Sequence, residues 1–234
     1  MNELLHSVGE LAPELWQSLA LTLKLAFVST ACLALIGIPL SLWLRNTRWR
    51  GAIVIETLVT LPIVLPPTVI GFYLLTFFAP QAVLGSIWLK ITGETLAFSF
   101  SGLVVGSVIY SLPFAMQPFQ AAFKGVSQTY LEAAKMMGAS GWQTFWQVSL
   151  PLARRGVAVG LTLSFAHTIG EFGVVLMLGG SIPGKTKVAS IALYDEVQKL
   201  NYAHAHTYAL ALLLISFGLI LLMMVVQRQT ESNE

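Results

Sequence analysis

The sequence contains few charged residues and a single cysteine. Charged residues make up 10% of the chain, whereas hydrophobic residues make up 56% and the mean hydropathy is +0.75. A soluble domain carries roughly 25% charged residues. A net charge of +2 provides no strongly basic surface, so no nucleic-acid partner is expected. The composition predicts a chain embedded in membrane lipid.

Cofactor-binding patterns are also scarce. Cys32 is the only cysteine, so it can form no intrachain disulfide. It lies within the apolar stretch at residues 16–44, where we expect it only to pack against other side chains. His204 and His206 have no cysteine or carboxylate at ligand spacing in their loop, so neither a metal site nor another cofactor is expected. Without repeats or low-complexity tracts, residues 1–234 are predicted to form one membrane domain.

Long apolar runs dominate the chain. A helix needs about 20 apolar residues to cross a hydrocarbon core of about 30 Å. Five stretches meet this requirement, at residues 16–44, 52–79, 96–119, 157–178 and 208–226. The predicted fold class is therefore an all-α polytopic membrane protein with five transmembrane helices.

Lysine and arginine are distributed unequally between the loops on the two sides of the membrane, if the chain crosses it five times. The loops after the first and third spans and the segment after the fifth contain Arg45, Arg48, Arg50, Lys124, Lys135, Arg154, Arg155 and Arg228. The other two loops contain only Lys90, Lys185, Lys187 and Lys199. Because basic loops remain in the cytoplasm, the N-terminus is predicted outside and the C-terminus inside. The acidic residues Glu3, Glu10 and Glu14 near the start agree with this orientation.

The predicted cytoplasmic loop at residues 124–155 contains two short helix patterns. Ser127 is a good N-cap, and residues 128–137 favour a helix. Gly138 follows them, at the position where a residue in the left-handed conformation commonly ends a helix. Ser140 and Gln143 then have capping-box spacing, and Pro151 is expected to end the second helix. Trp142, Phe145 and Trp146 share one face of this second helix.

This loop resembles the EAA signature of the membrane subunits of ABC importers. The matching residues are Glu132, Ala133, Ala134, Gly138, Val148, Leu150 and Pro151, with Val148 in place of the commoner isoleucine. The resemblance implies a type I importer permease fold, whose coupling helix sits in a groove on an ATPase subunit. An ordinary pair of amphipathic interfacial helices is the alternative.

The second span contains a proline-rich run, Leu61-Pro62-Ile63-Val64-Leu65-Pro66-Pro67. Each proline removes a backbone donor, so we predict a bent or broken helix, either beside a transport pathway or as a static kink. The run is similar to that of molybdate and sulfate permeases, as are the Gly170-Glu171-Phe172-Gly173 segment and the later G-G-x-I-P-G-x-T run.

Polar residues form a predicted stripe along the fourth span. Ser164, His167 and Glu171 recur at helical spacing, and a carboxylate at membrane depth must face protein, water or a partner such as His167. Two roles remain open, a structural bond between helices or a proton relay. A proton-coupled secondary carrier would use the His167 and Glu171 pair, but it would not need the coupling loop.

The run Gly179-Gly180-Ser181-Ile182-Pro183-Gly184-Lys185-Thr186 matches the phosphate-binding P-loop pattern. A true P-loop follows a buried strand and needs successive backbone N–H groups, whereas this run follows a membrane helix and contains Pro183. We expect instead an outer turn that helps receive an oxyanion or is simply flexible, followed by a surface helix over residues 187–200.

The resemblance covers nearly the whole chain and implies a non-catalytic permease subunit, without a cofactor, in a bacterial inner membrane. It also implies molybdate as the cargo, with tungstate or sulfate as the alternatives. The implied partners are a second copy of the chain, two ATPase subunits in the cytoplasm and an oxyanion-binding protein outside.

Overall fold

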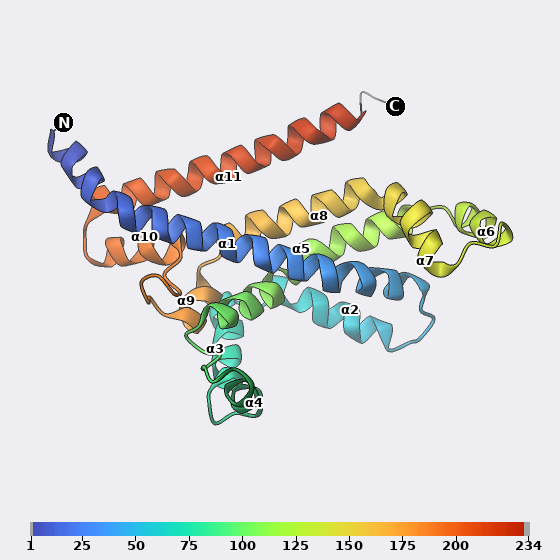
Figure 1. Cartoon of the computed structure of the whole chain (residues 1–234), viewed down its shortest axis with the longest axis horizontal. Helices are drawn as coiled ribbons and strands as arrows, with labels where there is room; N and C mark the ends of the chain where they lie inside the picture. The colour runs from blue at the N-terminus through green and yellow to red at the C-terminus, as the bar shows by residue number, and fades with distance from the viewer. Residues whose placement is uncertain (1, 232–234) are drawn as a thin grey trace.

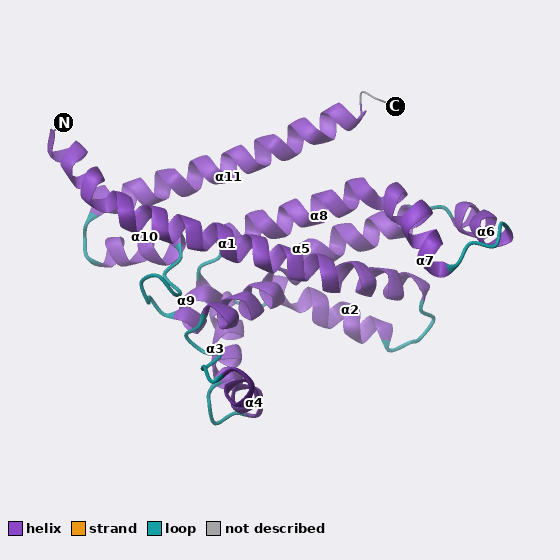
Figure 2. Cartoon of the chain, in the orientation of Figure 1, coloured by secondary structure: helices purple, strands orange, loops and turns teal. Residues whose placement is uncertain are grey.

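The computed structural model describes residues 2–231, with side-chain surroundings for residues 12–225. All regular elements in this part of the chain are helices (Figure 2). They are α1 (Asn2–Asn46), α2 (Ala52–Thr60), η1 (Leu61–Ile63), α3 (Pro67–Phe78), α4 (Val83–Thr92), α5 (Phe100–Gly125), α6 (Gln128–Met136), α7 (Gly141–Thr144), the π-helical turn η2 (Phe145–Ser149), α8 (Leu150–Gly170), α9 (Gly173–Gly179), α10 (Ala189–Gln198) and α11 (Tyr202–Glu231).

Three helices are long and apolar enough to cross a membrane, within residues 12–46, 100–125 and 202–225. Two further pairs of helices meet the same test but are bent, so there are up to five spans if each pair counts as one. The all-helical polytopic fold is confirmed, and the five-span count is the upper limit of this range. Glu3, Glu10 and Arg228, which the predicted orientation used, lie outside the described side chains.

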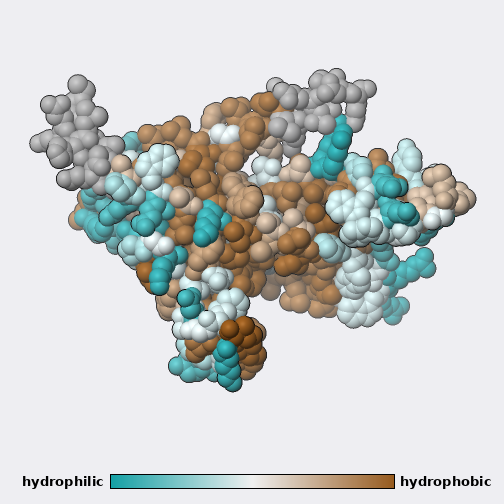
Figure 3. Space-filling view, viewed as in Figure 1, coloured by the Kyte–Doolittle hydropathy of each residue, from teal (hydrophilic) through white to brown (hydrophobic). Residues whose placement is uncertain are grey.

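Helices α1, α5 and α8 pack together as the centre of the bundle, and α11 lies along one side of it (Figure 1). Helices α6 and α7 project at one end, and α10 lies near the other. The surface shows a hydrophobic middle between more hydrophilic ends (Figure 3). This division matches the apolar interior of a bilayer between two aqueous faces.

Small residues allow α5 and α8 to approach closely. A Cβ on Gly160 would lie 2.6 Å from Phe119 Cε1, and one on Gly156 would lie 2.5 Å from Ala122 Cβ. Apolar burial contributes little between helices in lipid, so close van der Waals packing at such residues stabilises the pair. Phe119 itself is fully buried at this contact.

Both bent pairs break at a short segment between two helices. The second span turns by 113° between Ile63 and Pro67, which confirms the predicted break at the prolines. The fourth turns by 60° between Gly170 and Gly173. Neither pair is therefore one straight helix.

One predicted boundary was wrong. Pro151 does not end the helix that begins after Ser140, because that helix continues through η2 into α8. Pro151 lies in the first turn of α8, where its missing N–H is tolerated. The helix predicted over residues 187–200 is present as α10, with residues 189–192 at its start buried.

Candidate functional site

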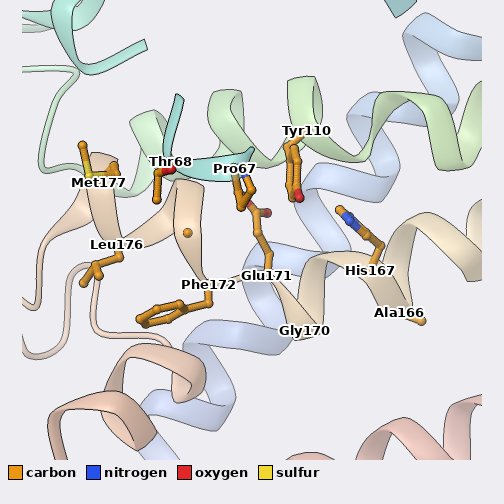
Figure 4. A pocket seen from close by; sticks show the side chains of 11 residues that line it. Pro67, Thr68, Tyr110, Ala166, His167, Gly170, Glu171, Phe172, Leu176 and Met177 are labelled. Carbon is orange, nitrogen blue, oxygen red and sulfur yellow. The ribbon is translucent and has the colours of Figure 1, made fainter. Parts of the chain in front are cut away.

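A cavity of about 530 Å³ lies where the breaks of the two bent pairs meet (Figure 4). Its lining comes from α3, α5, α8, α9 and the turn between α8 and α9. The lining residues are Pro67, Thr68, Tyr110, Ala166, His167, Gly170, Glu171, Phe172, Gly173, Leu176 and Met177. The residues that line this cavity include no lysine or arginine.

The second halves of the two bent pairs, α3 and α9, pack closely against each other. A Cβ on Gly173 would lie 2.8 Å from Pro67 Cβ, and one on Gly71 would lie 2.7 Å from Met177 Cβ. Glycine at these positions therefore lets the two helices touch along their length. This contact brings the prolines of the second span beside the polar turn of the fourth.

Glu171 occupies the turn after α8 and is buried, with 4% of its surface exposed. Its main chain is extended and not helical, and its carbonyl accepts a hydrogen bond of 2.7 Å from Ser190 Oγ on α10. Its side chain is directed toward Pro67 and Tyr110 (Figure 4). Among the described residues, neither carboxylate oxygen has a hydrogen-bond partner.

His167 bonds to α5 and not to Glu171. Its Nδ1 lies 2.9 Å from Ser111 Oγ, and its ring stacks on Phe114 with centroids 3.9 Å apart. The predicted stripe is thus only partly formed, since Ser164 and Thr168 are buried on α8 but the helix ends before Glu171. The direct pair that a proton relay would use is not formed.

The hydroxyl groups around His167 determine which of its nitrogens carries a proton. Thr168 Oγ1 donates to Ser164 O at 2.9 Å, so it accepts from Ser111 Oγ at 3.0 Å. Ser111 has then used its only proton and must accept from His167 Nδ1–H. A neutral His167 assigned in this way has an unprotonated Nε2.

The turn at residues 179–186 differs from a phosphate-binding loop. It follows the helix α9, whereas a P-loop follows a strand. Thr186 is buried, and its hydroxyl donates to Gly179 O at 2.7 Å and accepts from Ile182 N at 3.1 Å. Lys185 is exposed, and Gly180 and Gly184 have positive φ angles of 58° and 73°. A role for Gly179, Gly180, Pro183, Gly184 and Lys185 at an outer mouth stays a prediction.

The predicted loop at residues 124–155 has, in the part between α5 and α8, the local structure that its sequence predicts; this part, residues 126–149, is called the coupling loop below. The Ser127 side chain caps α6, and Gly138 follows it with φ +80°. Ser140 and Gln143 form the capping box of α7. Ala134 is buried, but Glu132 is exposed on α6.

Exposed apolar side chains gather on this loop. Met136 is 84% exposed, Met137 82% and Trp142 71%. The rings of Trp142 and Trp146 meet edge to face, with centroids 5.6 Å apart. Large apolar groups exposed at a polar end of the molecule are typical of a protein-binding surface.

The loop is joined to the bundle at both ends. Arg45 on α1 donates a 2.7 Å hydrogen bond to Val126 O, where the loop begins. At the other end, η2 contains Val148 and leads directly into Leu150 and Pro151 of α8. A displacement of the loop would therefore reach the helix that carries His167 and precedes Glu171.

Sequence reasoning missed the contribution of α5 and α3 to the cavity. Ser107 and Ser111 stand four residues apart in an apolar span, and both are completely buried. That spacing was a visible signal for a polar face opposite His167. Thr68 and Tyr110 had no such signal, because the fold of the breaks determines where they lie.

Comparison with known proteins agrees with these features. Residues 36–232 match the family described as "Binding-protein-dependent transport system inner membrane component". The chain is 45% identical over 212 residues to the molybdenum transport system permease protein ModB of Azotobacter vinelandii, covering 91% of this chain and 93% of that protein. It is 32% identical over 183 residues to the Escherichia coli (strain K12) protein of the same name, covering 78% and 80%.

Among solved structures, the fold resembles a chain of a bacterial ABC transporter that imports the acidic polysaccharide alginate. The TM-score is 0.75 at 20% identity, covering 91% of this chain and 78% of that one. This likeness shows the fold alone. The match over residues 36–232 and the identity to the ModB proteins show that the chain belongs to the family of binding-protein-dependent transport system inner membrane components.

Proposed function

We propose that this chain is the membrane-spanning subunit of an ATP-driven importer that carries molybdate into the cytoplasm. The observation that carries the proposal is the 45% identity, across 91% of the chain, to a molybdenum transport permease. The exposed coupling loop supports an importer driven by a partner ATPase. The chain itself supplies a path and no catalytic group.

The complex that fits this role contains two copies of the chain, two ATPase subunits at the coupling loop and an oxyanion-binding protein at the opposite face. In this arrangement α6 and α7 face the cytoplasm and the turn at residues 179–186 faces outward. Glu132, Ala133, Ala134 and Gly138 shape the ATPase contact, and Val148, Leu150 and Pro151 connect it to α8. The cavity at Glu171 lies beside the transport path.

Reconstitution tests this function. The chain, the ATPase and the binding protein would be purified together and placed in liposomes, with ATP supplied on the ATPase side. Molybdate uptake that requires both ATP and the binding protein is the expected result. Uptake that follows a pH gradient without ATP would overturn the proposal.

The cargo is tested in the same liposomes. Unlabelled tungstate and sulfate would be offered in competition with radiolabelled molybdate over a range of concentrations. Molybdate as the preferred anion supports the assignment. Uptake of sulfate in preference to molybdate would move the chain to the sulfate permeases and leave the mechanism unchanged.

A further inference from the structure

The Glu171 carboxyl is enclosed by the chain itself. Each of its two oxygens exposes less than 1 Å² and has no hydrogen-bond partner within residues 12–225. Lipid, a second subunit or bulk solvent cannot reach these oxygens without movement of the surrounding helices. An ionised carboxylate in such a place loses its hydration and gains no compensating contact.

A hydroxyl group lies beside this carboxyl and is uncharged. Ser107 on α5 faces the Glu171 carboxyl, is completely buried and has no hydrogen-bond partner of its own. A carboxylic acid carries one O–H donor as well as acceptor positions, so an acid and a hydroxyl can satisfy each other after a small adjustment. A carboxylate could only accept from Ser107 and would keep its charge in an apolar wall.

The cavity beside this acid has hydroxyl groups and no cation. Thr68 and Tyr110 line it, and neither hydroxyl has a hydrogen-bond partner among the described side chains. His167 lines it too, but in its neutral form Nε2 is an acceptor and would not bind an anion. The side-chain donors that the cavity offers to a ligand are therefore the Thr68 and Tyr110 hydroxyls.

We propose that this cavity is a transient contact site for a tetrahedral oxyanion, in which the Thr68 and Tyr110 hydroxyls are the donors and Glu171 is carried as a neutral acid behind them. The proposal rests on the function proposed above. A site without a fixed positive charge holds a dianion weakly, which suits a position that the anion must leave in every cycle. A charged Glu171 would repel the same anion.

The titratable groups that face Glu171 are few. Helix α5 contributes Tyr110 and α8 contributes His167. Helices α3 and α9 contribute no titratable side chain to the cavity, and α10 contributes the hydroxyl of Ser190. Loss of the Glu171 proton at alkaline pH would thus place an uncompensated negative charge beside the anion.

Infrared spectroscopy tests the protonation of Glu171 without any transport. The purified complex would be measured at pH 7 for the C=O stretch of a protonated carboxylic acid, in the wild type, in Glu171→Gln and in Glu94→Gln. Glu94 is exposed, so its change is the matched control. The acid band should disappear in Glu171→Gln and remain in Glu94→Gln. A band that is already absent from the wild type, or that survives Glu171→Gln, would overturn the neutral-acid assignment.

Transport kinetics test the donors. In the reconstituted importer, Thr68→Val and Tyr110→Phe remove one hydroxyl each at nearly constant shape, and each should slow molybdate uptake at saturating binding protein by about three- to thirtyfold. Binding of molybdate to the isolated binding protein should not change. Full uptake in the double variant would refute the contact site while leaving the importer function intact.

The pH dependence of molybdate uptake tests whether the proton on Glu171 affects the contact of the anion with the cavity. Wild-type uptake should fall on the alkaline side, whereas Glu171→Gln, which is neutral, similar in shape and unable to ionise, should keep most of its uptake at pH 7 and show no alkaline decline. Identical pH profiles for the two proteins would contradict the role given to the proton. If no variant transports and the wild type also fails to respond to ATP, the proposed function itself is wrong.

Discussion

Residues that are neighbours in sequence shape the coupling loop, whereas residues far apart shape the cavity at the helix breaks. The loop depends on contacts such as Ser140 with Gln143, which close within one helical turn. In the cavity, Ser111 bonds to Thr168, 57 residues away, and Ser190 on α10 bonds to the Glu171 carbonyl. A loop of the first kind can be moved as a unit, while a site of the second kind changes only when whole helices shift.

This difference indicates how a movement of the coupling loop is transmitted to the cavity. The loop exposes its apolar side chains and continues through η2 into α8, at whose far end the cavity lies. A partner that moves the loop would therefore move one wall of the cavity.

Gly138→Val should uncouple the importer. Gly138 has φ +80°, a conformation that adds about 1 to 3 kcal/mol of strain for a residue with a side chain. The helix before it would be redirected, and ATP hydrolysis stimulated by the loaded binding protein should fall at least about tenfold, with the melting temperature of the bundle unchanged. Stimulated hydrolysis by the assembled complex is the measurement.

Gly141→Val is the matched control, because a Cβ at either glycine meets nothing within 4 Å and only Gly138 has a positive φ. It should keep most of the stimulated hydrolysis. Equal losses in both variants would mean that side-chain bulk, and not backbone conformation, is what the loop cannot tolerate.

Gly173→Ala should disturb the cavity by lowering the stability of the fold, whereas Gly138→Val acts on coupling. Its Cβ would lie 2.8 Å from Pro67 Cβ, and such overpacking destabilises a protein by about 1 to 3 kcal/mol. We expect a lower melting temperature in detergent together with slower uptake. Gly170→Ala is the control, since its Cβ meets nothing within 4 Å. An unchanged melting temperature for Gly173→Ala would contradict the tight contact of α3 with α9.

Glu196 is buried like Glu171, but its carboxylate has hydrogen-bond and ion-pair partners. Its carboxylate accepts from Lys199 Nζ at 2.7 Å and from Asn201 Nδ2 at 3.1 Å, and it lies 3.4 Å from His204 Nδ1. Burial raises the pKa of Glu196, but the hydrogen bond and charge of Lys199, together with the charges of His204 and Lys187, lower it by more, so the pKa is below the ordinary 4.5.

A carboxyl whose pKa is lowered by folding stabilises the fold above its ordinary pKa and loses this effect as the pH falls through the lowered value. Glu196→Gln should therefore melt earlier than wild type at pH 7, by the equivalent of about 1 to 3 kcal/mol. The difference should shrink below pH 4.5. Melting curves from pH 7 downward provide the measurement, and a difference that grows toward acid pH would mean that the ionised form is not the stabilising one.

Lys185→Ala should have the smallest effect. Lys185 is exposed on a turn whose Thr186 hydroxyl is already occupied, so the sequence match to a P-loop does not produce nucleotide binding. The affinity of the assembled importer for ATP should be unchanged. A nucleotide that crosslinks to Lys185 in the isolated chain would reverse this conclusion.

The sequence predicted the coupling loop because its signals are local. Ser127, Gly138 and the capping box act within a few residues of themselves, so their positions along the chain determine the structure. The prolines of the second span predicted a break for the same reason. Pro151 was misjudged because proline both ends helices and begins them, and only the helix that follows decides between the two.

The cavity could not be predicted in the same way. One expected partner of Glu171 was His167, close along the chain, but the helix breaks after Gly170 and His167 bonds to Ser111 of α5 instead. Whether two polar groups meet across helices depends on packing at residues such as Gly160 and Phe119. No local pattern carries that information.

The central claim is that the coupling loop is the surface through which an ATPase drives the bundle. With Cys32 replaced by serine, Met137→Cys and Lys185→Cys would place one thiol at each end of the molecule, on side chains that are exposed. A bifunctional crosslinker would then be applied to the assembled complex with and without ATP. The account predicts that Met137→Cys is joined to the ATPase subunit with a yield that depends on ATP, and that Lys185→Cys is not joined to it. Crosslinking of the ATPase to Lys185→Cys, and none to Met137→Cys, would contradict it.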